Sequence, residues 1–252
     1  MTAPATPATP ATPAAPTAAP TPPVAVVTGG SAGLGRALVN ALAAQGWTVV
    51  TDGRDPAALA PLAELPGVRP LAGDVADPAH RERLAAAVAG AGRLDLLAHN
   101  ASTLGPLPLR RLRDLAPPDL DAVWAVNAAA PHALTRLLVD HLRDSGGVLL
   151  SLSSDVVSGH HPTWGGYAAT KAALDHLTLT WGAEESVAAY AVDPGDMRTR
   201  MHQDAFPGED VSDRPDPATV VPRLLALLSH RPPSGRYRAD DLPAPASEPV
   251  AR

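Results

Sequence analysis

The sequence predicts an α/β fold with a doubly wound, mostly parallel sheet of about seven strands and helices on both faces. The first observation is that short runs rich in valine and leucine alternate with Ala- and Leu-rich stretches of helical character from Val24 onward. The second is a glycine-rich turn, TGGSAGLG at 28–35, which follows the first run and opens a helical stretch. This alternation is typical of βαβ units, whose crossover helices cover both faces of a parallel sheet.

The elements are assigned in order from these runs. Strands are expected at 24–28, 47–52, 68–73, 94–100, 147–153 and 187–193, with a weak last strand at 235–239. Helices are expected to fill the gaps, and the best bounded are 33–45, 78–91, 119–143, 167–183 and 217–229. Several of them begin with Asp or Pro in the first turn, where a free N–H group is either capped or not required.

Two connecting segments, 101–118 and 195–216, are long for a compact domain, and such loops are usually functional. Both follow strand ends at the edge where open α/β sheets bind ligands. We expect the substrate pocket to form from 101–118, 155–166 and 196–216. The larger apolar side chains expected there are Trp164, Met197, Met201 and Phe206. They indicate an apolar ligand, or else the packing of a lid.

Composition excludes several classes of function. The chain has 252 residues, a formal net charge of −6 and no cysteine. It therefore offers no basic field for nucleic acid or anionic lipid, no disulfide, no thiolate metal site and no Cys nucleophile. No run approaches the roughly 20 apolar residues that cross a bilayer. We expect a cytoplasmic protein that binds neither nucleic acid nor membrane.

The ends of the chain differ in composition from its centre. Residues 1–23 are rich in Ala, Thr and Pro, lack the basic and apolar regions of a signal peptide, and are expected to form a disordered tail. Residues 243–252 are expected to form a second, flexible tail. One domain is expected between them, at 24–242, because its length suits a single α/β domain.

The glycine-rich turn is the first motif with a chemical interpretation. Glycines at 29, 33 and 35 permit a tight turn and a close approach of the backbone to a pyrophosphate. The negative charge of that group suits the free N–H groups at a helix N-terminus. A plain strand-to-helix connection is the alternative, but the position at the head of a βαβ series favours a dinucleotide site.

The segment YAATK at 167–171 contains the only lysine of the chain, four residues after one of its three tyrosines. On a helix this spacing places Lys171 beside Tyr167 on one face. Hydride transfer to a carbonyl creates an alkoxide, to which a phenol can donate a proton. A fixed ammonium would lower the phenol pKa from its ordinary value of about 10. Considered alone, Tyr167 would more often be a packing residue.

Taken together, the motifs resemble the single-domain type of the short-chain dehydrogenase/reductase family, which has a Rossmann fold. The resemblance covers about 24–240 and rests on TGGSAGLG at 28–35, Asp74 in GDV, HNAS at 99–102, Asn127 in AVNAAAP, Ser154, YAATK, and DPGDMRT at 193–199. One departure is Ser102, because the family usually has glycine at this position. The serine in place of glycine would alter the loop near the nicotinamide.

The resemblance implies four catalytic roles. Tyr167 would be the general acid, Ser154 would bind the substrate oxygen, and Lys171 would hold the nicotinamide ribose and relay protons. Asn127 would order a water next to the lysine. Ser153 is the alternative to Ser154 if the register differs by one residue.

The resemblance also implies a cofactor site. Its residues would be Gly29, Ser31, Gly33, Leu34, Gly35, Arg54, Asp74, Val75, Asn100, Ala101, Tyr167, Lys171, Pro194, Gly195, Met197 and Thr199. The carboxylate that selects NAD would stand at the position of Gly53, and the arginine that pairs with the 2′-phosphate of NADP at Arg54. NADPH is therefore favoured and NADH is possible. Asp52 pointing into the site would reverse the choice.

The predicted function is that of an oxidoreductase, a carbonyl reductase or alcohol dehydrogenase. It would transfer hydride reversibly from NADPH to the carbonyl of a small, apolar ketone or aldehyde. The alternative is a catalytically silent dinucleotide-binding protein with a regulatory or scaffolding role. A homodimer or homotetramer is expected. No metal site is predicted, and histidines such as His160 and His161 are interpreted as loop or surface residues lining the substrate entrance.

Overall fold

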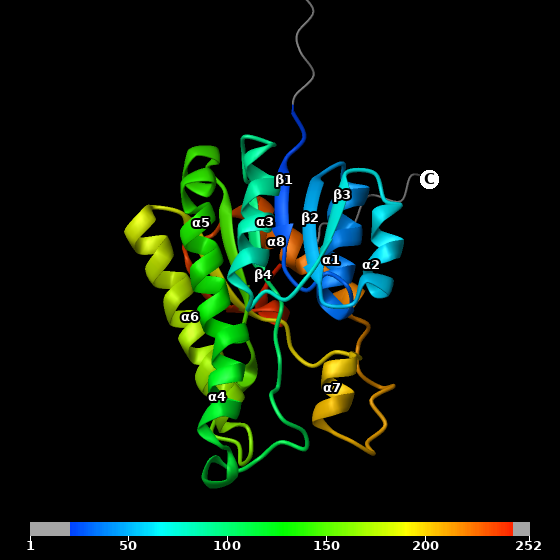
Figure 1. Ribbon diagram of the computed structural model, residues 1–252, viewed down its shortest axis with the longest axis vertical. Helices are drawn as coiled ribbons and strands as arrows, with labels where there is room; N and C mark the ends of the chain where they lie inside the picture. The colour runs from blue at the N-terminus through cyan, green and yellow to red at the C-terminus, as the bar shows by residue number, and fades with distance from the viewer. Residues whose placement is uncertain (1–20, 244–252) are drawn as a thin grey trace, which may run out of the picture.

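The structure is a computed structural model that describes residues 21–243, so the two expected tails lie almost wholly outside the described residues. Its centre is one sheet of seven strands in the order β3-β2-β1-β4-β5-β6-β7 (Figure 1). The strands are β1 (Val24–Val27), β2 (Thr48–Gly53), β3 (Val68–Ala72), β4 (Leu96–His99), β5 (Val148–Leu152), β6 (Ala188–Asp193) and β7 (Gly235–Arg238). Every pair is parallel, which confirms the predicted fold class and includes the weak last strand.

The sheet is buried on both faces because successive side chains of its strands enter two different cores. In β1, Ala25 and Val27 belong to one core, whereas Val24 and Val26 belong to the other. The first core is closed by α1 (Gly33–Ala44), α2 (Pro56–Ala63) and α8 (Val221–His230). The second is closed by α3 (Pro78–Ala89) and α5 (Ala130–Ser145), with α6 (Gly165–Glu185) beside them.

The helices follow the predicted order with three differences. The single helix predicted over 119–143 consists of α4 (Pro117–Trp124), a π-helical segment (Ala125–Ala129) and α5. Two short helices were given no bounds from the sequence: α2 lies in a gap between strands where a helix was expected, whereas α7 (Arg200–Ala205) lies inside the predicted loop 195–216. The helix predicted over 217–229 begins with a 3-10 turn (Pro217–Thr219) before α8.

Helix starts use the capping groups that the sequence offers. The side chain of Asp55 accepts a hydrogen bond from the N–H of Ala57 at 2.9 Å, at the start of α2. Asp77 accepts from the N–H of Ala79 at 3.0 Å, at the start of α3. A proline follows each aspartate, at a position where no N–H donor is needed. These caps fix where each crossover helix begins relative to the strand before it.

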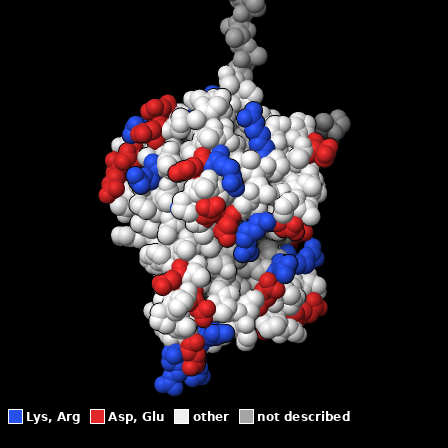
Figure 2. Space-filling model, viewed as in Figure 1, with Lys and Arg blue, Asp and Glu red and all other residues white. Residues whose placement is uncertain are grey.

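The functional end of the molecule lies beyond the carboxyl ends of the strands, at the bottom of Figure 1, where α4 and α7 project past the sheet. On the face shown in Figure 2, cationic and anionic side chains are interspersed. Among the helices of residues 21–243, none combines the length and the apolar character needed to span a bilayer.

Candidate active site

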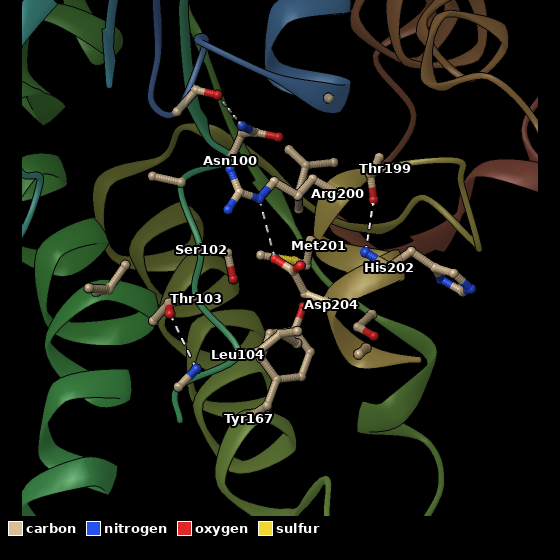
Figure 3. A pocket seen from close by; sticks show the side chains of 18 of the residues that line it. Asn100, Ser102, Thr103, Leu104, Tyr167, Thr199, Arg200, Met201, His202 and Asp204 are labelled. Carbon is tan, nitrogen blue, oxygen red and sulfur yellow. Dashed lines mark hydrogen bonds and ion pairs between the residues drawn. The ribbon is translucent and has the colours of Figure 1, made fainter. Parts of the chain in front are cut away.

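A cavity of about 1430 Å³ opens at the carboxyl ends of the strands. Figure 3 shows Asn100, Ser102 and Tyr167 on one side of it and Thr199 and Met201 on the other, where α7 begins. The glycine-rich turn and the residues after β2 and β3 line one end, and the polar residues of α6 and the β5 end line the other. This is the edge at which an open α/β sheet binds its ligands.

All but one of the residues predicted to bind a cofactor line this cavity. They are Gly29, Ser31, Gly33, Leu34, Arg54, Asp74, Val75, Asn100, Ala101, Tyr167, Lys171, Pro194, Gly195, Met197 and Thr199. The exception is Gly35, which packs beneath the turn. A β-carbon at Gly35 would collide with the carbonyl of Gly29 and the side-chain amide of Asn100. Glycine is therefore needed there for the packing of α1 and not for contact with a ligand.

The glycine-rich turn is fixed by side chains from two neighbouring strands. Gly29 has a φ of +71°, and its N–H donates to Oδ1 of Asp52 at 2.6 Å. The side-chain amide of Asn100 donates to the carbonyl oxygens of Thr28 and Gly29 at 2.9 and 3.1 Å. Asp52 is buried, and its Oδ2 lies 3.0 Å from Nε2 of His80. Asp52 lines the cavity, but both oxygens of its carboxylate are engaged, one by the N–H of Gly29 and the other by His80.

The same turn fits the pyrophosphate of a dinucleotide. Ala32 and Gly33 line the cavity at the start of α1, and no side chain of residues 21–243 caps this helix N-terminus. The first N–H groups of α1 are therefore available to a negatively charged group, which the positive end of the helix dipole also favours.

Tyr167 and Lys171 lie one turn apart on α6, and both are buried. Nζ of Lys171 lies 5.7 Å from the centroid of the Tyr167 ring and donates to the carbonyl oxygen of Leu152 at 2.7 Å. Burial lowers the pKa of Lys171 to about 8, although the carboxylate of Asp175 acts in the opposite direction. A pKa near 8 lets the amine exchange a proton close to neutral pH.

The phenol of Tyr167 is neutral over a wide pH range. Burial raises the pKa of Tyr167 to about 12, and the charges of Asp155 and Asp193 add to the rise, whereas hydrogen bonds with Ser102 and Ser154 oppose it. This differs from the expectation that Lys171 lowers the phenol pKa. The ammonium is directed to the Leu152 carbonyl, and the loss of solvation outweighs the other influences.

The two serines that follow β5 have different partners. The hydroxyl of Ser153 is buried and donates to Oδ2 of Asp175 at 2.7 Å. Ser154 lines the cavity, its hydroxyl lowers the pKa of the Tyr167 phenol, and it donates to Oδ1 of Asp155 at 3.1 Å. Both serines line the cavity, but the hydroxyl of Ser153 is engaged by Asp175, whereas that of Ser154 influences the phenol of Tyr167.

Asn127 is buried within the π-helical segment and does not line the cavity. Its Oδ1 accepts from the N–H of Thr103 at 2.9 Å and from Oγ of Ser102 at 3.2 Å. Its Nδ2 donates to the carbonyl oxygen of Thr103 at 2.9 Å and to Oγ1 of Thr170 at 3.0 Å. The amide is fully used in joining the loop after β4 to α6. That Asn127 orders a water next to Lys171 stays a prediction.

Ser102 contributes more to the site than its sequence position suggested. Its hydroxyl donates to Asn127 and also lowers the pKa of the Tyr167 phenol, so a glycine at this position would remove both effects. The signal in the sequence was the departure from the usual glycine. Asp155, whose charge affects the phenol, carried no such signal.

The wall opposite the glycine-rich turn is apolar. Leu104, Val156 and Tyr167 form a buried cluster, against which Trp164 and Met201 pack. The ring of Trp164 lies 5.9 Å from that of Tyr167 and 5.8 Å from that of Phe206, measured between centroids. All three segments expected to form the pocket contribute to this cavity.

Two histidines correct the expectation that the histidines lie in loops or on the surface. His80 and His99 are buried. Nδ1 of His80 lies 2.9 Å from Nη2 of Arg83, and Nε2 of His99 lies 2.7 Å from Oγ1 of Thr135. Burial lowers the pKa of His99 to about 3, and the charge of Lys171 adds to the effect, so the ring is neutral. His161 is exposed and lines the cavity, as expected.

Comparison with known proteins gives a consistent result. A family described as short chain dehydrogenase matches residues 23–210. An L-xylulose reductase of Bos taurus is 33% identical over 223 residues, which are 82% of this chain and 89% of that protein. An uncharacterized oxidoreductase of Saccharomyces cerevisiae is 32% identical over 184 residues, 71% of this chain and 72% of that protein. A solved short chain dehydrogenase from Shigella flexneri, complexed with NADP, is 29% identical with a TM-score of 0.78, over 86% of this chain and 97% of that one.

Proposed function

The chain belongs to the short-chain dehydrogenase family of oxidoreductases, and from that premise we propose that it reduces the carbonyl group of a small, apolar ketone or aldehyde with NADPH. The reaction would be reversible, so a secondary or primary alcohol would be oxidised in the other direction. The observation that carries the proposal is the neutral phenol of Tyr167, which lines one cavity together with Ser102, Ser154 and the glycine-rich turn.

Each group has its own role in the proposed reaction. The glycine-rich turn and Lys171 would hold a reduced nicotinamide dinucleotide, which would supply the hydride for the carbonyl carbon. The phenol of Tyr167 donates its proton to the carbonyl oxygen as negative charge develops there, and the hydroxyl of Ser154 donates a hydrogen bond to the same oxygen. Lys171, whose pKa lies near 8, would hold the nicotinamide ribose and relay a proton to the phenolate that remains. Asn127 keeps the loop that carries Ser102 in place.

NADPH is favoured over NADH by the charges at the end of β2. Arg54 is exposed and lines the cavity, which suits a 2′-phosphate. Gly53 stands where a carboxylate would select NAD, and the carboxylate of Asp52 is bound by Gly29 and His80. The similar protein from Shigella flexneri that was solved with NADP supports this choice.

An apolar substrate is supported by the aromatic and aliphatic wall opposite the glycine-rich turn. Small ketones, aldehydes, diketones and quinones are therefore the compounds to screen. The reductase among the relatives supports reduction as the direction of reaction. The cytoplasmic location and the homodimer or homotetramer expected from the sequence remain proposals.

The test is to follow NADPH oxidation with a panel of these carbonyl compounds. We expect at least one compound to be reduced by the wild-type protein and by Tyr237→Phe, whose hydroxyl lies at the far edge strand. Tyr167→Phe should bind NADPH but show almost no turnover. Equal turnover in both tyrosine variants would contradict the assignment of Tyr167. A wild-type protein that binds NADPH tightly and reduces nothing would favour the catalytically silent alternative.

A further inference from the structure

Two charged side chains lie directly behind the reactive face of the cavity. Asp175 is one turn beyond Lys171 on α6, and its side chain is buried. Arg236, on the edge strand β7, donates from Nε to Oδ2 of Asp175 at 3.0 Å. Its Nη2 donates to the carbonyl oxygen of Ser154 at 2.8 Å. One guanidinium therefore joins the edge strand, α6 and the backbone of the serine that contacts the phenol.

The same carboxylate contacts the segment after β5 at a second point. Oδ2 of Asp175 also accepts from the hydroxyl of Ser153 at 2.7 Å. The pair of Asp175 and Arg236 thus fixes the first two residues after β5. It holds Ser153 by its side chain and Ser154 by its carbonyl oxygen. The direction of the Ser154 hydroxyl depends on the backbone that these contacts hold.

Stability alone gives a poor account of this arrangement. Oδ1 of Asp175 is buried and has no hydrogen-bond partner among the described residues, so the carboxylate is incompletely satisfied. Removing charges from water costs several kcal/mol per ion, and apolar replacements of buried pairs are often neutral or stabilising. Asp175 does, however, provide the negative charge nearest to the buried ammonium of Lys171.

We propose that Asp175 and Arg236 form a positioning pair for the reaction, which holds Ser154 by its carbonyl oxygen and balances the charge of Lys171 from behind. The pair touches neither substrate nor cofactor in this role. The proposal rests on the proposed function of the same site, but its first test does not require turnover.

The charged and titratable groups around Lys171 come from three elements. Tyr167 and Asp175 lie on its own helix, His99 lies on β4, and Arg236 on β7 lies beyond Asp175. Tyr167 and His99 are neutral at neutral pH. Asp175 is therefore the one anion among these groups, and its negative charge compensates the positive charge of Lys171.

The first test uses the fact that Lys171 is the only lysine. Protein made with ¹³Cε-labelled lysine gives one side-chain resonance, whose shift can be followed against pH in the free protein. We expect the wild-type resonance to titrate near pH 8, the pKa to which burial lowers Lys171. In Asp175→Asn, a nearly isosteric variant, the titration should move to lower pH because the compensating charge is lost. An unchanged titration would overturn this part of the proposal.

The second test separates positioning from stability. Arg236→Met should lower kcat by about tenfold to a hundredfold with little change in KM, because a small displacement of a reacting group has this effect. Arg236→Lys keeps the charge but cannot reach both partners as a fork, so its kcat should be intermediate. The control is Arg223→Met, since Arg223 donates to the carbonyl oxygens of Ala239 and Asp240 near β7 without touching Ser154 or Asp175.

The outcomes are distinguishable. If both Arg236 variants lose no more kcat than Arg223→Met does, the pair is structural and the positioning role is wrong. If the wild-type protein reduces no carbonyl compound, the proposed function fails, while the lysine titration still decides whether Asp175 controls the charge of Lys171. Should Arg236→Met not fold, Arg236→Lys and Asp175→Asn carry the test, because both keep the shape of the side chain they replace more closely.

Discussion

At the scale of single residues, the molecule is organised around one lysine. All other cationic side chains are arginine, and Lys171 is buried next to Tyr167 with its amine on the Leu152 carbonyl. An ammonium is a compact charge on a flexible stem, whereas a guanidinium is planar, wider and effectively always protonated. The position therefore requires lysine in size and in chemistry.

Lys171→Arg is expected to lose at least about 100-fold in kcat although the charge is kept, which corresponds to about 2.7 kcal/mol in the transition state. Arginine cannot release a proton near neutral pH, and its fork does not fit a space made for one ammonium. Steady-state kinetics on the folded variant provide the measurement. Wild-type turnover would mean that the only lysine has no role in the chemistry.

Arg54→Ala should weaken the binding of NADPH far more than that of NADH. Removing a charge-assisted contact to a phosphate costs on the order of 1.5–3 kcal/mol. Arg69→Ala is the matched control, because Arg69 is an exposed arginine on the neighbouring strand β3 and does not line the cavity. Titration of both cofactors by fluorescence or calorimetry decides, and an equal loss for the two would refute the assignment of Arg54.

Some residues of the site could be read from the sequence and others could not. Tyr167 and Lys171 were readable because their spacing on one helix determines their proximity. The hydrogen bond between Arg236 and Asp175 joins positions 61 residues apart, and it depends on the pairing of β7 with β6. No local pattern contains that information. The occupied amide of Asn127 likewise depends on how the loop after β4 folds back.

At the scale of elements, the strands and the long helices were predictable because the hydrophobic period and the capping residues indicate the same elements. The bounds of α2, of 8 residues, and the existence of α7, of 6 residues, could not be predicted, because so few residues show little periodicity. The π-helical segment between α4 and α5 could not be seen either, since one extra residue per turn leaves the composition unchanged. It places Asn127 against Thr170 of α6.

Helix α7 is held at its start by one side chain. Oγ1 of Thr199 accepts from the N–H of His202 at 3.2 Å. Thr199→Ala removes a cap worth about 1 kcal/mol, so we expect KM to rise several-fold while the melting temperature hardly changes, because α7 lies outside the two cores of the sheet. Thr199→Ser keeps the capping oxygen and should behave as wild type. A large fall in melting temperature with unchanged KM would show that α7 serves stability instead.

At the scale of the whole molecule, the site reduces stability in a way that depends on pH. Burial lowers the pKa of Lys171 from 10.5 to about 8, so the folded state disfavours the ammonium. Below pH 8 both the folded and the unfolded chain are protonated and the full cost is present. Between about pH 8 and 10.5 the unfolded chain binds more protons, and stability therefore rises with pH.

The corresponding prediction compares wild type with Lys171→Met. Between pH 8 and 10.5 the free energy of unfolding of wild type should increase relative to that of this variant. The expected increase is on the order of 3 kcal/mol, because this is the free energy equivalent to the fall in the pKa of Lys171. Urea denaturation at several pH values gives the difference. If the difference does not depend on pH, the amine of Lys171 is not desolvated in the folded protein.

The most direct test of the central claim follows the hydride itself. NADPH that carries deuterium at the transferred position is mixed with the protein and a carbonyl compound reduced in the screen, and the product is analysed by mass spectrometry. With wild-type protein we expect the alcohol to carry the deuterium on its carbinol carbon, whereas Tyr167→Phe should bind the cofactor but form almost no labelled alcohol. A labelled alcohol formed equally well by Tyr167→Phe, or deuterium that stays on the bound cofactor in the wild-type protein, would contradict it.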